Sequence, residues 1–345
     1  METFNVGIER IFSSELISVE QLIFEFIAIL PISVGIGLIA SMTGISGGAF
    51  KVPVLIILFA LTAELASAAS LLSAMFVAVT SSLGYYRHRP MPINFRIGLL
   101  LVIVTIPGTY MGIVIRTIIE EAHLLRLTFG ILLFPIALKL LMALPYDLDR
   151  TTGEGKTAGF SQLSIERLIL SVMATFMAGV SAGILGLGGG TIIVPVLCIL
   201  LNFPILAAAA TSMFTMIFTS AAGSLMNYYV FVQTENMFAF MFYGLAMGAG
   251  MIIGGIIGPR YVSKIDGRKL QRFFAFILIF PLVKMMTLGQ LWLDPSGTNY
   301  IMATIGDLII WLVIGVPLWV ITSYRIKSRH EGSDQNNTGQ VLLID

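Results

Sequence analysis

One stretch of this sequence occurs twice, and the duplication limits the folds the chain can adopt more than any other feature. Residues 44–55 (GISGGAFKVPVL) return at 186–197 (GLGGGTIIVPVL), 142 positions later. The same offset pairs Ser70 with Ser212. A duplicated, strongly apolar sequence with a glycine-broken segment at the same place in each half is typical of secondary transporters.

The composition excludes several other classes of protein. Hydrophobic residues make up 57% of the 345 residues, charged residues only 11%, and the mean hydropathy is +0.94, which indicates a membrane protein. The net charge of +1 says nothing about nucleic acid, and no basic tract suggests it, so we expect no nucleic acid as a partner. The single cysteine, Cys198, excludes a disulfide framework or thiolate metal site within one chain. Because His88, His123 and His330 fall in predicted loops or the tail, we expect no metal site and no cofactor.

Each half contains five apolar segments, and one more follows at the end. They cover residues 22–43, 49–61, 64–86, 95–116 and 123–144, then 166–186, 191–203, 205–231, 237–258 and 270–289, and finally 300–324. Most approach the ~20 residues that cross a ~30 Å hydrocarbon core as a helix. The segments after the glycine clusters are too short to cross comfortably, which favours broken or re-entrant helices. The sequence therefore predicts an all-α polytopic membrane protein with two inverted repeats and an extra C-terminal transmembrane helix.

This pattern divides the chain into six parts. They are an interfacial lead-in (1–21), repeat 1 (22–144), a cytoplasmic linker (145–165), repeat 2 (166–289), the extra helix (290–324) and a polar cytoplasmic tail (325–345).

The basic residues of the loops predict the orientation. The loop at 87–96 is basic and its counterpart at 230–236 is not, whereas the loop at 259–272 is basic and its counterpart at 116–126 has two arginines offset by two glutamates. Cytoplasmic loops carry the excess of Lys and Arg. The switch between matching loops indicates inverted repeats in the cell membrane, with the N-terminus outside and the C-terminus in the cytoplasm.

The glycine clusters are the first candidate substrate site. They and the prolines that follow are Gly47, Gly48 and Pro53 in repeat 1, and Gly188, Gly189, Gly190 and Pro195 in repeat 2. Glycine lets the backbone leave helical geometry, and the exposed N–H groups and positive dipole end of the next half-helix can bind an anion. Proline lacks an N–H and loosens that helix further. The alternative is that the glycines only allow close helix packing; the duplication favours the site.

Hydroxyl side chains form a second candidate feature. Ser70 and Ser73, and Ser212, Thr215 and Thr219, recur at helical spacings of three and four and give one polar face on the following helix. This face would donate hydrogen bonds to an oxyanion. Small hydroxyl residues also ease contacts between membrane helices, and the sequence leaves both interpretations open.

Lys51 is the main charge at membrane depth and has Ile193 as its counterpart. We expect a fixed positive charge on an anion pathway, the alternative being a lysine that reaches the membrane interface. Arg116 is assigned to a loop, and Tyr85 to the interfacial aromatic belt. Glycine stripes such as the one around Gly108 predict tight packing, either within the fold or between protomers, so a homodimer stays open.

With both glycine motifs in view, the chain resembles the sulfite exporter TauE/SafE family, also called the 4-toluene sulfonate uptake permease family. The resemblance covers roughly residues 22–290 and rests on Gly47-Gly48 with Val52-Pro53 and Gly189-Gly190 with Val194-Pro195. It implies a permease for small sulfur-containing anions such as sulfite, sulfonates or related organic acids. The first copy departs from the second in having Ser46 where Gly188 stands, and in Lys51.

Other functions remain in competition with a secondary anion transporter. A passive anion channel of the same fold predicts a continuous polar lining, and a carrier of carboxylates or other small anions would share the site. A membrane-embedded enzyme needs paired carboxylates or a nucleophile–base set, which the sequence does not show, so we expect no enzyme. Proton coupling stays open, although few titratable residues are available to carry it.

Overall fold

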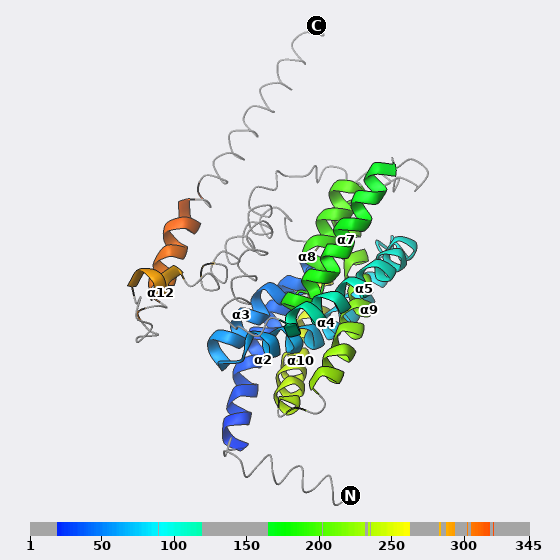
Figure 1. Ribbon diagram of the computed structural model, residues 1–345. Coiled ribbons are helices and arrows are strands. Elements are labelled where there is room, and N and C mark those ends of the chain that lie inside the picture. Colours follow the sequence, from blue (N-terminus) through cyan, green and yellow to red (C-terminus); the bar gives the residue numbers. More distant parts are fainter. Residues whose placement is uncertain are drawn as a thin grey trace, which may run out of the picture.

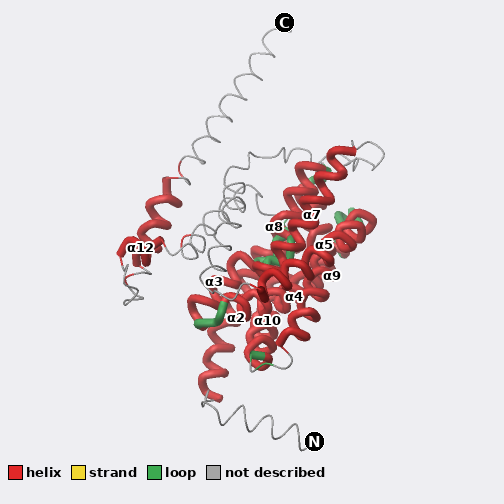
Figure 2. Tube along the Cα trace, in the orientation of Figure 1, coloured by secondary structure: helices red, strands yellow, loops and turns green. Residues whose placement is uncertain are grey.

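The structure is a computed structural model. It describes residues 19–118 except 89, and 165–262 except 202, 232, 233 and 235, together with short pieces at 283, 288–293, 302, 305–317 and 320. All regular elements in these ranges are helical (Figure 2). The predicted segment 123–144 and the tail 325–345 lie outside the described residues, as do nearly all of the linker and most of segment 270–289.

The described helices follow the predicted apolar segments. Repeat 1 contains α2 (Val19–Thr43), α3 (Gly48–Phe59), α4 (Ala63–Tyr86) and α5 (Phe95–Ile118). Repeat 2 contains α7 (Ile165–Leu185), α8 (Gly190–Pro195), the π-helix η3 (Val196–Leu200), α9 (Ile205–Phe231) and α10 (Met237–Tyr261), and α12 (Leu288–Leu293) follows. Predicted segment 300–324 contains a helix over Ile305–Pro317, and its crossing of the membrane stays a prediction.

Five helices among the described residues are long and apolar enough to cross a membrane: α2, α4, α5, α9 and α10. By contrast, α3 has 12 residues, so at 1.5 Å per residue it reaches only ~18 Å, short of the ~30 Å core. Large apolar side chains face outward, such as Phe24 (73% exposed) and Ile103 (69%), while many serines and threonines are buried. This arrangement suits lipid as the surrounding solvent, and the protein is a multi-pass membrane protein.

Local sequence explains where the long helices begin. The Thr62 side chain caps α4 by accepting a hydrogen bond from the Leu65 N–H at 3.3 Å, and Glu64 lies in the first turn, where a carboxylate suits the helix dipole. Asn94 caps α5 in the same way through Ile97, at 3.2 Å.

The last described long helix of each repeat packs against helices of the other repeat. Helix α10 packs on α2 and α4 of repeat 1, α5 packs on α7 and α9 of repeat 2, and α4 lies against α9 between them (Figure 1). Gly108 and Gly112 of α5 approach the backbone of α7 at Gly179 and Gly183 so closely that a β-carbon at any of them would overlap the facing chain. The glycine stripe of α5 therefore serves packing within the fold.

Candidate substrate site

Both predicted helix breaks are present. After α2 ends at Thr43, Gly44 and Gly47 take positive φ angles of 75° and 70°, and α3 begins at the next residue. After α7 ends at Leu185, three glycines take φ angles between 63° and 81°, and α8 begins. These three are Gly186, Gly188 and Gly189. Only glycine adopts this region without strain, which explains why each break is glycine-rich.

The two breaks lie against each other. A β-carbon on Gly48 would overlap the carbonyl group of Gly186, and one on Gly190 would overlap that of Gly44. The glycines therefore allow a close approach of the two breaks, a packing role that the sequence had offered as the alternative to an anion site. The breaks are buried in this conformation.

The departure of the first motif from the second has a steric explanation. A β-carbon on Gly188 would lie 2.8 Å from the Ser46 Cβ, so the two equivalent positions face each other and only one side chain fits between them. The Ser46 hydroxyl donates a hydrogen bond to the Leu187 carbonyl and accepts one from the Gly48 N–H at 3.3 Å.

The prolines have different consequences in the two repeats. Pro53 lies inside the continuous helix α3, whereas Pro195 ends α8, and the chain continues as the π-helix η3. A proline removes one backbone donor and disturbs the preceding turn, and short π-helical segments are frequent at functional sites.

The predicted hydroxyl face holds the breaks in place through reciprocal hydrogen bonds. The Ser70 hydroxyl donates to the Gly186 carbonyl at 2.8 Å, and its counterpart Ser212 donates to the Gly44 carbonyl at 2.9 Å. In this conformation the two hydroxyl protons bind backbone carbonyls across the interface between the repeats.

The remaining predicted hydroxyls are also buried. Ser73 donates to the Ser70 carbonyl at 2.9 Å, Thr215 donates to the Thr211 carbonyl at 3.0 Å, and Thr219 pairs with the Thr105 hydroxyl at 2.9 Å.

Lys51 is completely buried. Its ammonium donates to the Ser70 carbonyl at 2.7 Å and to the Ser73 hydroxyl at 3.0 Å. This geometry excludes, in the described conformation, the alternative in which the side chain reaches the membrane interface. When the side chain is protonated it has three donors, so one N–H would remain beyond these two hydrogen bonds.

Sequence reasoning missed a second buried cation, Arg116. The sequence predicts a loop at this position, but α5 continues to Ile118 and the Arg116 side chain is only 1% exposed. Its Nη1 donates to the Ser67 hydroxyl at 3.0 Å and to the Gly183 carbonyl at 3.1 Å, and its Nη2 donates to the Asn227 side-chain carbonyl. The spacing of residues could have predicted this burial. Arg116 follows Gly108 and Gly112 at intervals of four and so lies on the face of α5 that meets α7.

The assignment of Tyr85 to the aromatic belt is also wrong. Tyr85 is buried, and its hydroxyl donates to the Ser41 carbonyl at 2.7 Å. Its neighbour Tyr86 is 58% exposed and Tyr229 is 69% exposed, as belt residues are.

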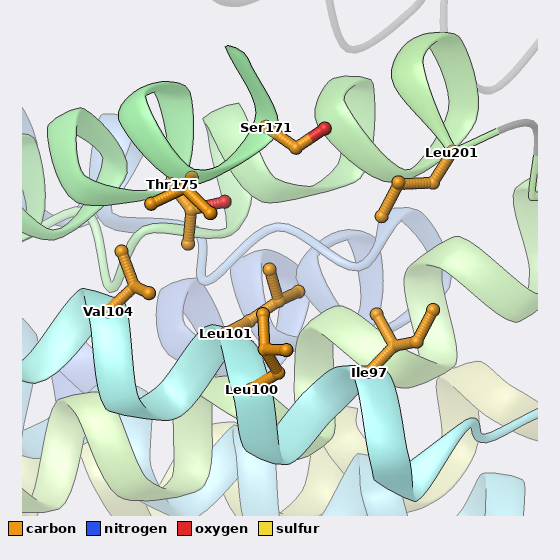
Figure 3. A pocket seen from close by; sticks show the side chains of 8 residues that line it. Ile97, Leu100, Leu101, Val104, Ser171, Thr175 and Leu201 are labelled. Atoms are coloured by element: carbon orange, nitrogen blue, oxygen red, sulfur yellow. The ribbon is translucent and has the colours of Figure 1, made fainter. Parts of the chain in front are cut away.

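Two hollows of the structure lie away from the breaks. One is a cavity of about 10 Å³ between α5 and α7, room for about one water and too small for an oxyanion (Figure 3). It is mostly apolar, and the buried Thr175 hydroxyl beside it has no hydrogen-bond partner. The other is an open hollow of about 400 Å³ at the start of α5, near Asn94 and Arg96.

Comparisons with known proteins agree with this architecture. The model of the sulfite exporter TauE/SafE family matches residues 29–285. The chain is 25% identical over 268 residues to the probable membrane transporter protein YunE of Bacillus subtilis, covering 74% of this chain and 95% of the relative. It is 28% identical over 274 residues to the probable membrane transporter protein MJ0441 of Methanocaldococcus jannaschii, covering 75% and 96%. No solved structure matches.

The family is one of membrane transporters and both relatives are named as probable membrane transporter proteins, which confirms the prediction of a transporter rather than an enzyme. A match over most of the chain, together with the duplicated glycine breaks, identifies the protein as a member of the sulfite exporter TauE/SafE family of membrane transporters.

Proposed function

We propose that the protein is a secondary transporter of small sulfur-containing or organic anions, such as sulfite or sulfonates, across the cell membrane. The observation that carries this proposal is the buried amino group of Lys51. Lys51 lies in the first turn of α3, and its side chain donates to the Ser70 carbonyl and the Ser73 hydroxyl of α4. Ionisable groups at membrane depth are functional by default, and a cation there suits an anionic substrate.

The proposed site combines this ammonium with backbone donors. The first turns of α3 after Gly47 and of α8 after Gly189 carry the positive end of the helix dipole. In this conformation the Gly48 N–H donates to the Ser46 hydroxyl, and it would become available to an anion when the breaks separate. Protonated Lys51 would add a full positive charge and a third N–H donor. It would do so on the repeat 1 side only, because its counterpart in repeat 2 is Ile193.

The reciprocal contacts suggest how access would alternate. The breaks touch in this conformation, so an anion enters only when Gly48 and Gly186 move apart. The matching hydrogen bonds of Ser70 and Ser212 would then open and close as one repeat moves against the other. Their reciprocity supports a twofold relation between the repeats, and with the basic loops we propose inverted repeats, an outside N-terminus and a cytoplasmic C-terminus.

Uptake into proteoliposomes tests this function. We expect radiolabelled sulfite or a sulfonate to enter with a saturable rate, and to exchange with unlabelled anion inside. A carboxylate such as acetate tests the related carrier, and an imposed pH gradient tests proton coupling. Conductive flux that does not saturate would identify a channel instead, and a lack of uptake for every anion in folded protein would contradict the proposal.

A further inference from the structure

Arg116 is a buried charge without a carboxylate partner. In the described part of the chain no carboxylate oxygen lies within 4.0 Å of it, and all its hydrogen bonds go to neutral oxygens. Its Nε–H is buried with no hydrogen-bond partner. The half-buried Glu64 acts on it electrostatically but beyond ion-pair distance. Guanidinium stays protonated in proteins, so a full charge is held here at a considerable cost in desolvation.

The contact of α5 with α7 around Arg116 can be compared with the equivalent contact of α10 with α2. In the other repeat, Gly258 stands at the position of Arg116, Ser41 at that of Gly183, and Tyr85 at that of Asn227. There the Tyr85 hydroxyl donates to the Ser41 carbonyl, and Gly258 of α10 packs directly against Ser41 of α2. The fold therefore builds the same helix junction with neutral groups, and the charge of Arg116 is not required for packing.

Arg116 of α5 and Lys51 of α3 both contact serines of α4 that donate to carbonyl groups at or next to the break after α7. On α4, Ser67 donates to the Ile184 carbonyl at 3.0 Å, and one turn later Ser70 donates to the Gly186 carbonyl. Arg116 donates to the Ser67 hydroxyl, and Lys51 donates to the Ser70 carbonyl. Two cations therefore lie along one face of α4, against the break between α7 and α8.

Both cations belong to repeat 1, and both have uncharged counterparts in repeat 2. Coulomb attraction grows with the product of the charges, so two cations favour a doubly charged oxyanion over a singly charged one. A guanidinium also presents N–H donors in the geometry that fits the oxygens of an oxyanion.

We propose that Arg116 is a second cationic contact for the transported anion, which it binds through its free Nε–H, and that Arg116 and Lys51 together favour dianionic oxyanions over monoanions. This inference rests on the proposed function. The hydrogen bond from Arg116 to the Ser67 hydroxyl would hold the guanidinium in place while no anion is bound.

Three variants test it: Arg116→Gln, Arg116→Lys and, as the matched control, Tyr85→Phe, which removes the hydrogen bond of the equivalent neutral junction. The probes are sodium sulfite and sodium methanesulfonate, whose anion carries one charge. The measurements are KM for uptake into proteoliposomes, and the unfolding temperature of purified protein with each salt against sodium chloride of equal ionic strength.

We expect R116Q to raise the KM for sulfite about tenfold or more, to raise that for methanesulfonate less, and to lose the stabilisation by sulfite. R116K should show a smaller rise, and Y85F should keep the selectivity between the two anions. A folded R116Q with unchanged KM and selectivity would overturn the inference. If R116Q does not fold, R116K becomes the deciding variant, because lysine keeps the charge but lacks the Nε–H. A KM for sulfite equal to that of the wild type would then overturn the inference. Wild-type protein that transports neither of these two anions would overturn this inference, and only a lack of uptake for every anion, carboxylates included, would overturn the proposed function itself.

Discussion

Replacing Lys51 with methionine is the sharpest test of the proposed site, because the structure separates its effect on binding from its effect on folding. The ammonium is buried before any anion arrives, so its desolvation is part of folding and does not oppose binding. An anion at ~4 Å in an effective dielectric of about 20 would be attracted by about 4 kcal/mol. Desolvation of the anion removes part of this gain.

The expected loss of binding lies between about 1.4 and 4 kcal/mol, which corresponds to a rise in KM between about tenfold and several hundredfold. Folding should be little affected. The Ser70 carbonyl still accepts from the Ser73 hydroxyl after the ammonium is gone, so the change leaves no buried oxygen unpaired. Desolvation of a buried charge costs free energy of folding, so an apolar side chain of similar length should not weaken folding.

The assay is the initial rate of sulfite uptake into proteoliposomes as a function of concentration, with the unfolding temperature measured on the same preparations. Ile193→Met is the matched control, because it places the same side chain at the equivalent position of repeat 2, where no charge is lost. A K51M protein that is folded and whose KM stays within about twofold of the wild type would refute the role of Lys51. The site would then consist of backbone and hydroxyl groups alone.

Three further predictions concern the breaks and the topology. Gly48→Ala and Gly190→Ala should each lower the unfolding temperature and abolish uptake, because the added carbon overlaps the facing carbonyl group; normal uptake by both variants would show that the breaks are not the site. Ser70→Ala and Ser212→Ala should each destabilise the protein by about 1–3 kcal/mol in thermal unfolding, since a buried carbonyl loses its donor across the interface; an effect in only one of them would argue against equivalent roles. Cysteines at positions 89 and 234, in a background lacking Cys198, should react with a membrane-impermeant thiol reagent from opposite sides, and reaction from the same side would replace the inverted arrangement with a parallel one.

The sequence alone was sufficient to locate the helix breaks. Positive φ angles at Gly44, Gly47, Gly186, Gly188 and Gly189 follow from a property of glycine itself, and the duplication marked both places independently of any contact. Hydropathy was sufficient to predict the long helices in the described part of the chain, because each span must satisfy its own backbone hydrogen bonds in lipid. Family membership followed from the same two motifs.

Which side chains meet was decided only by the tertiary structure. In a membrane protein the lipid-facing and the buried surfaces of a helix are both apolar, so the sequence did not show that α5 and α10 are exchanged between the repeats. Arg116 stands at a helix end next to a polar segment, where an interfacial arginine and a buried one have the same sequence context, and only its approach to Ser67 and Gly183 distinguishes them. The hydrogen-bond partners of Lys51 could not be predicted from the sequence either. A hydrogen bond between α3 and α4 depends on how the two helices pack and not on the spacing of their residues.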